Sequence, residues 1–139
     1  MNPLTLKEAE TLFSGITQSI SIIKKTEVVV CPQFIYSEKL KKFSRKILLG
    51  AQDSFFGDVG AFTGEISAQM LYDLGMRYVI LGHSERRALG ESNTDINKKI
   101  KGSLSAGLRP ILCVGENARD ENHEYLNFVK TQLIECLSG

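Results

Sequence analysis

The sequence predicts an α/β fold in which parallel strands alternate with helices in a single domain over residues 1–139. Short apolar runs recur along the chain, and each is followed by a glycine or a proline. Between these runs, apolar residues recur at the spacing of helices. Such alternation with short connections is typical of parallel strands joined by right-handed crossovers. No segment has the composition of a linker or of a low-complexity tract.

Strands are expected where an apolar run ends at a turn-forming residue. We expect four of them, over residues 27–31, 47–50, 78–81 and 110–114. Helices are expected from residue 5, over 37–44, 67–74 and 92–106, and from about 120 to 137. Thr5 and Glu8 have the spacing of a capping box, and Ser37 can cap the second helix. Gly75 suits the left-handed residue that ends a helix.

A dense group of polar residues follows the third expected strand. Gly82 ends the apolar run, and directly after it come His83, Ser84, Glu85, Arg86 and Arg87. In parallel β/α barrels the catalytic residues lie at the carboxyl ends of the strands, so this segment is where the sequence predicts chemistry. Residues 84–87 can open a short helix whose backbone amides would lie near the ring of the histidine.

Residues 78–87 resemble the electrophilic-histidine motif of the triosephosphate isomerase family. Gly-Ala-Phe-Thr-Gly-Glu at 60–65 resembles that family's dimer-loop motif, Pro-Ile-Leu-Cys-Val-Gly-Glu at 110–116 resembles its fifth-strand motif, and Ala51-Gln52 also fits. The motifs match the family in order and spacing. The resemblance implies a parallel β/α barrel, which takes about 250 residues when complete. These 139 residues are expected to form an incomplete barrel, four of the eight βα units, from strand two to strand five.

The resemblance also implies segments that have no counterpart in this sequence. In the family, a first strand ending in an Asn-x-Lys-Met-Asn-like motif precedes the first helix, and Met1-Asn2 would sit directly after that lysine. The family's catalytic glutamate, closing lid and glycine-rich phosphate loops lie beyond the fifth strand. We therefore expect this chain to be a fragment that is inactive when made alone.

By resemblance, His83 and Glu85 are catalytic residues of a glycolytic and gluconeogenic isomerase. It interconverts dihydroxyacetone phosphate and D-glyceraldehyde 3-phosphate by proton transfer. His83 takes the role of the electrophile that polarises the carbonyl, and this family is the standard example of a histidine that acts in its neutral form. Glu85 resembles a glutamate that pairs with the catalytic lysine. Because that lysine has no counterpart here, we expect Arg86 or Arg87 to supply the partner charge.

Two residues are expected at a dimer contact, since the family implies a homodimer. Thr63 resembles the loop residue that reaches the neighbouring subunit's active site, and Gln52 resembles a residue that supports it. Glu91 resembles a further family carboxylate, although the segment before it is one residue shorter. Gln33 and Asp53 stand where the family often has proline and asparagine, and we expect Asp53 to alter the contacts of the dimer loop.

Composition limits the other functions. The net charge of +1 gives no general attraction to nucleic acid, and no apolar stretch approaches the roughly 20 residues of a membrane span. We expect no cofactor and no metal, because nucleotide-binding glycine motifs and zinc-ligand spacings are lacking. The odd number of cysteines without a signal peptide predicts a cytoplasmic protein. Cys31 and Cys113 are expected to be buried, and His123 is expected at the surface.

An alternative to the enzyme is a non-catalytic half-barrel that only associates with itself. A closed barrel has no strand edges, whereas an incomplete one leaves two, which we expect at residues 27–31 and 110–114. Both runs are apolar and carry no charge in the middle, so each can pair with another chain. We expect the isolated chain to self-associate.

Overall fold

Four parallel strands form the centre of the molecule. The computed structural model describes residues 2–43, 47–116, 118–119 and 124–139. The strands are β1 (Val29–Val30), β2 (Leu48–Ala51), β3 (Tyr78–Leu81) and β4 (Arg109–Leu112). They form one open sheet in the order β1-β2-β3-β4, and each neighbouring pair is parallel. The expected parallel α/β fold is confirmed, and β1 and β4 are the edges of the sheet as expected.

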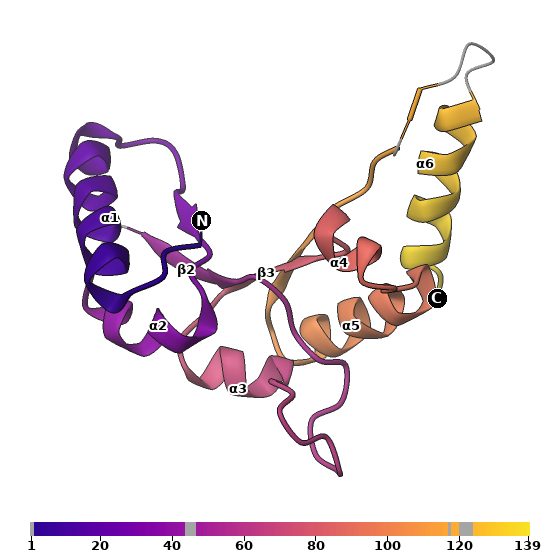
Figure 1. Ribbon diagram of the computed structural model, residues 1–139, viewed down its shortest axis with the longest axis horizontal. Helices are drawn as coiled ribbons and strands as arrows, with labels where there is room; N and C mark the ends of the chain where they lie inside the picture. The colour runs from indigo at the N-terminus through magenta and orange to yellow at the C-terminus, as the bar shows by residue number, and fades with distance from the viewer. Residues whose placement is uncertain (1, 44–46, 117, 120–123) are drawn as a thin grey trace.

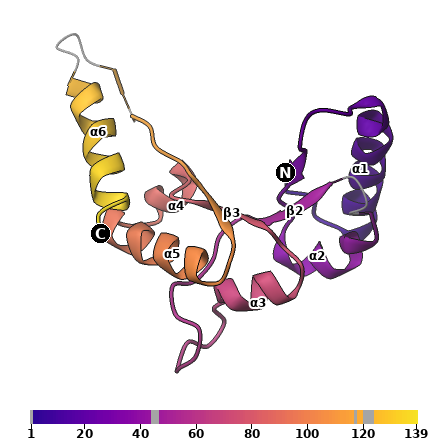
Figure 2. The ribbon, with the colours of Figure 1, turned by 180° about the vertical axis from the view of Figure 1, so that it is seen from behind.

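The helices lie around one side and both ends of this sheet. They are α1 (Leu6–Ser19), α2 (Phe34–Leu40), α3 (Ala68–Asp73), α4 (Ser84–Ala88), α5 (Asn93–Ser105) and α6 (Glu124–Cys136), with short turns η1 (Ile20–Ile22) and η2 (Lys41–Phe43). Figure 1 shows α2, α3 and α5 beneath the sheet and α1 and α6 at its two ends, so that the molecule is arched. Figure 2 shows the same arrangement from behind.

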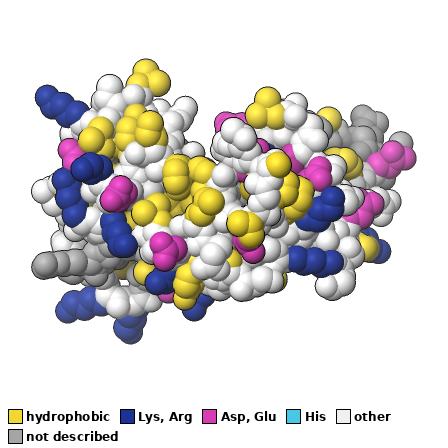
Figure 3. Space-filling view, turned by 90° about the horizontal axis from the view of Figure 1, so that it is seen from below, with side chains coloured by type: hydrophobic (Ala, Val, Ile, Leu, Met, Phe, Trp, Pro, Cys, Tyr) yellow, Lys and Arg dark blue, Asp and Glu magenta, His cyan; other side chains and the backbone are white. Residues whose placement is uncertain are grey.

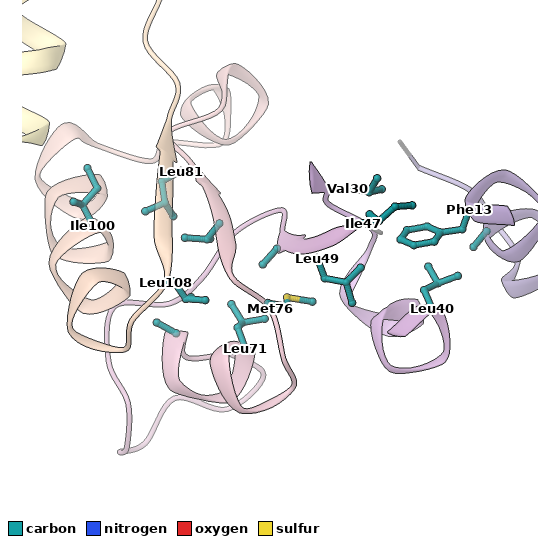
Figure 4. Close-up of a cluster of buried hydrophobic side chains, with 14 of the residues drawn as sticks. Phe13, Val30, Leu40, Ile47, Leu49, Leu71, Met76, Leu81, Ile100 and Leu108 are labelled. Atoms are coloured by element: carbon teal, nitrogen blue, oxygen red, sulfur yellow. The ribbon is translucent and has the colours of Figure 1, made fainter. Parts of the chain in front are cut away.

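The hydrophobic core lies between the sheet and the helices beneath it. In β3, Val79 and Leu81 are buried, whereas Ile80 on the other face is half-buried. Figure 4 shows the core as a band that runs from Phe13 of α1 to Ile100 of α5. Full burial of a side chain such as Phe13 contributes roughly 1.5–3 kcal/mol to stability. The core therefore holds the strands against their helices, and the opposite face of the sheet stays partly open.

The underside of the molecule carries both apolar and charged side chains. Figure 3 shows apolar side chains in the central part of this view, with lysine and arginine spread over several places around them. On α3, Met70 and Tyr72 are among the exposed large hydrophobic residues. The mixed charge fits the small net charge of the chain.

Two helix starts differ from expectation. The predicted cap at Ser37 is wrong, because α2 already begins at Phe34 after Gln33, and the Ser37 hydroxyl donates to the carbonyl of Gln33 at 3.1 Å. Serine inside a helix commonly bonds back to the preceding turn in this way. At α1, Thr5 accepts from the Glu8 amide as expected, but the Glu8 carboxylate accepts from Leu4, one residue before the cap.

The first strand and two cysteines also differ from expectation. Only Val29 and Val30 pair with β2, because the strand lies at the sheet edge and Pro32 has no amide hydrogen to extend the pairing. Cys31 and Cys113 are half-buried rather than buried, since they lie on the open face. His123 and the start expected for the last helix lie outside the described residues.

Candidate functional site

The site is built where β3 ends. Gly82 follows the strand with φ of +71°, a conformation that side-chain-bearing residues rarely adopt. A Cβ atom on Gly82 would meet Arg87 Nη2 at 2.9 Å and the Cys113 carbonyl oxygen at 3.1 Å. Glycine is therefore required for the chain to turn so closely at this point. The turn directs His83 out of the strand and into the start of α4.

His83 caps the N-terminus of α4 with its own side chain. The backbone amide of Glu85 donates to Nδ1 of His83 at 3.4 Å, while the amides of Arg86 and Arg87 donate to the His83 carbonyl at 2.9 and 3.0 Å. In this contact Nδ1 is the acceptor, so Nε2 is the ring nitrogen that can donate a hydrogen bond elsewhere. The expected short helix with its amides near the ring is confirmed.

His83 lines a cavity of about 530 Å³ on the open face of the sheet. Apart from the histidine, the described lining is made of apolar residues and cysteines: Ile16, Val29, Val30, Cys31, Ile80, Ile111 and Cys113. This lining contains no carboxylate and no lysine. Within the described part of the chain, the imidazole is thus the polar group that this apolar cavity offers to a ligand.

Glu85 points into solvent, and neither arginine neutralises it. Its side chain is 87% exposed and its Oε2 lies 3.8 Å from Nδ1 of His83. The expectation that Arg86 or Arg87 pairs with Glu85 is wrong. Arg86 pairs with Asp53 and Glu91. Helix geometry explains this outcome, because adjacent positions on a helix point in different directions.

Arg87 fastens α4 to the end of the sheet and to the neighbouring helices. It donates through Nε to the Gly82 carbonyl at 2.7 Å and through Nη2 to the Cys113 carbonyl at 3.2 Å. Its Nη1 donates to Asn93 at the start of α5, at 2.6 Å, and Nη2 also lies 3.7 Å from the sulfur of Cys136 in α6. Four contacts to uncharged groups hold this one guanidinium in place.

A cluster of four charged residues lies beside α4 and consists of Asp53, Arg86, Glu91 and Lys99. Asp53 accepts from Nζ of Lys99 at 2.9 Å through both oxygens and lies 2.8 Å from Nε of Arg86. Oε1 of Glu91 contacts both cations, while its Oε2 is buried without a hydrogen-bond partner among the described residues. Burial raises the pKa of Asp53, and the bond to Lys99 opposes that increase.

The two residues expected at a dimer contact, Gln52 and Thr63, both lie in the segment between β2 and α3. Gln52 donates to the Cys31 carbonyl at 3.1 Å, which joins the ends of β1 and β2. Thr63 is exposed in the loop between β2 and α3. In that loop Phe55 packs on Phe56, with ring centroids 4.3 Å apart, and on Phe62, with ring centroids 4.8 Å apart. The loop is therefore shaped by its own aromatic contacts.

Parallel strands covered by helices, with a polar segment at the carboxyl end of a strand, are typical of the class of β/α-barrel proteins. The sequence model of the family described as "Triosephosphate isomerase" matches residues 1–139. The chain belongs to the triosephosphate isomerase family.

Individual relatives agree with this family. A triosephosphate isomerase of Dehalococcoides mccartyi (strain 195) is 45% identical over 139 residues, covering 97% of this chain and 55% of the relative. One from Thermoanaerobacter sp. (strain X514) is 46% identical over 119 residues, covering 83% of this chain and 48% of the relative. The crystal structure of triosephosphate isomerase from Bartonella henselae matches with a TM-score of 0.82 and 32% identity, over 99% of this chain and 58% of that one.

The chain spans about half the length of the curated relatives it matches. The structure is therefore that of a part of a triosephosphate isomerase barrel. None of the helices in the described ranges is long and apolar enough to cross a membrane.

Proposed function

We propose that this chain is part of a triosephosphate isomerase that interconverts dihydroxyacetone phosphate and D-glyceraldehyde 3-phosphate in glycolysis and gluconeogenesis. The orientation of His83 carries the proposal. Its Nδ1 accepts from the Glu85 amide, which leaves the Nε2 hydrogen for a ligand in the adjoining cavity. The names of the relatives support the same activity.

The proposed chemistry needs a donor of this kind. Removing a proton from the carbon beside a carbonyl places negative charge on the carbonyl oxygen, and a fixed donor at that oxygen lowers the barrier. A neutral imidazole can donate there without losing its proton to solvent. Glu85, at the first turn of α4, adds negative charge near the ring and is the second residue that we assign to the site.

We further propose a cytoplasmic homodimer in which the loop between β2 and α3 contacts the second subunit. Thr63 is exposed on that loop, where it is accessible to a partner. Gln52 supports the base of the loop through its bond to the Cys31 carbonyl. The packed rings of Phe55 and Phe62 give the loop a defined shape before any contact forms.

The isolated 139-residue chain is proposed to be inactive. General acid–base catalysis requires a group that removes the proton, and the cavity beside His83 has no carboxylate in its described lining. A second candidate function is therefore a non-catalytic half-barrel that self-associates. The observation that favours it is the open sheet face, where Ile111 of the edge strand β4 is 40% exposed.

A coupled isomerase assay separates these candidates. The 139-residue chain is assayed alone and as a chimera, joined to the segments of the Dehalococcoides relative that it does not cover. We expect no turnover above background from the chain alone and clear turnover from the chimera. Turnover by the chain alone that disappears in His83→Gln would show that it needs no other segment. A folded chimera without activity would contradict the enzymatic proposal.

A further inference from the structure

We propose that Asp53 is a positioning residue for His83 and acts through Arg86. The inference rests on the function proposed above, because the residue that Asp53 positions is the electrophile of that site. Asp53 lies in the loop after β2 and contacts neither His83 nor its cavity. Its influence must therefore pass through the residues of the charged cluster.

A continuous path of contacts leads from Asp53 to His83. Oδ2 of Asp53 lies 2.8 Å from Nε of Arg86. The amide of Arg86 donates to the His83 carbonyl at 2.9 Å, and the next amide toward the N-terminus, that of Glu85, donates to the His83 ring. The guanidinium thus belongs to the same helical turn that fixes the imidazole.

Helix α4 depends on such external contacts. It has five residues, and a helix of that length is unstable without tertiary packing, because few of its backbone bonds offset the cost of nucleation. Two arginines fasten it. Arg87 binds uncharged groups, whereas Arg86 binds carboxylates. The charge-dependent contacts of α4 are therefore those of Arg86, and they include Asp53.

The negative charge of Asp53 completes the balance of the cluster. Two carboxylates face two cations, and the side chains of Glu91 and Lys99 are only 6% and 7% exposed. Without the Asp53 charge, Lys99 and Arg86 would share the single oxygen of Glu91 that already contacts both. A buried cation keeps the nearest carboxylate, so the more exposed Arg86 would be released and α4 would loosen.

The test compares Asp53→Asn with Asp73→Asn, which changes an exposed aspartate at the end of α3. In the folded 139-residue chain, hydrogen exchange of the Glu85 amide and the imidazole ¹⁵N signals of His83 are measured by NMR. In Asp53→Asn we expect exchange about tenfold faster, the effect of weakening one hydrogen bond. The two ring signals should move toward each other as the tautomers mix. Asp73→Asn should change neither.

A purely structural role for Asp53 would give a different result. It would lower the melting temperature of Asp53→Asn while the Glu85 exchange rate and the His83 signals stayed as in the wild type, and that outcome would overturn the proposal. The route through Arg86 is tested by adding Asp53→Asn to Arg86→Gln. We expect no further change in that background, because both substitutions remove the same contact. If Asp53→Asn accelerated exchange of the Glu85 amide in the Arg86→Gln background as much as it does alone, its effect would not pass through Arg86.

A conservative variant guards against loss of the fold. Asp53→Glu keeps the charge and is expected to retain Glu85 exchange within about threefold of the wild type, a small change on the scale of local opening. Exchange as fast as in Arg86→Gln would overturn the proposal. These readouts do not involve turnover, so an inactive chimera would count against the proposed function and leave this inference standing.

Discussion

The backbone amide of Glu85 donates to Nδ1 of His83, with 3.4 Å between the two nitrogens. The two residues are neighbours in a turn, yet their side chains have separate tasks, because the bond uses the backbone of Glu85 and leaves its carboxylate in solvent. The imidazole is held by the helix that it caps. The ring also lines the cavity on the open face of the sheet.

Gly82→Ala should destabilise the chain more than Gly90→Ala. Both glycines have positive φ values, +71° and +100°, but a Cβ atom on Gly82 would contact Arg87, Ile96 and Cys113, while Gly90 has open space around it. Backbone strain alone costs about 1 kcal/mol, and we expect about 2 kcal/mol or more at Gly82. Urea unfolding of both variants measures the difference. Equal losses in the free energy of unfolding for the two variants would show that the close contacts around Gly82 add no cost beyond backbone strain.

Cys31 should react slowly with alkylating agents in the folded chain. Burial raises the pKa of its thiol to about 11. Since the thiolate is the reactive form, such a pKa leaves roughly a hundred-fold less thiolate at pH 8 than an ordinary cysteine has. Peptide mass spectrometry after timed iodoacetamide treatment, with urea-unfolded chain as reference, reports the rate. Equal alkylation rates of Cys31 in the folded and unfolded chain would contradict the raised pKa of its thiol.

Ser92→Ala should remove a pH-dependent part of the stability of α5. Ser92 and Asp95 form a capping box, and the hydrogen bonds from Ser92 lower the pKa of Asp95. A carboxyl with a lowered folded pKa stabilises the fold above its unfolded pKa of 3.8 and loses that contribution as the pH falls through the folded value. Removing the cap should cost about 1 kcal/mol at pH 7.

The measurement is urea unfolding of Ser92→Ala between pH 7 and pH 2.5, values chosen to span this titration. The difference in the free energy of unfolding between Ser92→Ala and the wild type should decrease below about pH 4. Ser105→Ala at the other end of α5 serves as the control and should show no such narrowing. If this difference in the free energy of unfolding stayed constant with pH, Ser92 would not stabilise the charged form of Asp95.

The isolated chain should self-associate through its open face and edge strands. Ile111 of β4 is 40% exposed, and β1 and β4 each pair on one side only. Ile111→Lys should reduce the association, because a charge on an edge strand opposes pairing. Ile134→Lys on α6, where the isoleucine is 59% exposed, is the matched control. Light scattering at about 50 μM, in the range where unpaired edges associate, gives the mass; a clean monomer would contradict this prediction.

The fold and the position of His83 could be predicted because their signals are local. Each strand and helix is encoded in a short segment, and His83 directly follows the strand that carries it. The charged cluster could not be predicted, since Asp53 and Lys99 are 46 residues apart and meet only through tertiary packing. For the same reason the pairing expected for Glu85 was wrong, because Arg86 finds better placed carboxylates outside its own turn.

His83 is proposed to polarise the substrate carbonyl, and measuring kcat of the chimera with His83→Gln tests this role. We expect kcat to fall by roughly 10²–10⁴, the usual contribution of a general acid–base group. KM should change little, because the interaction strengthens in the transition state. Asp73→Asn serves as a matched surface change and should leave both constants unaltered. A His83→Gln chimera that keeps kcat within about threefold of the parent would contradict the role proposed for His83.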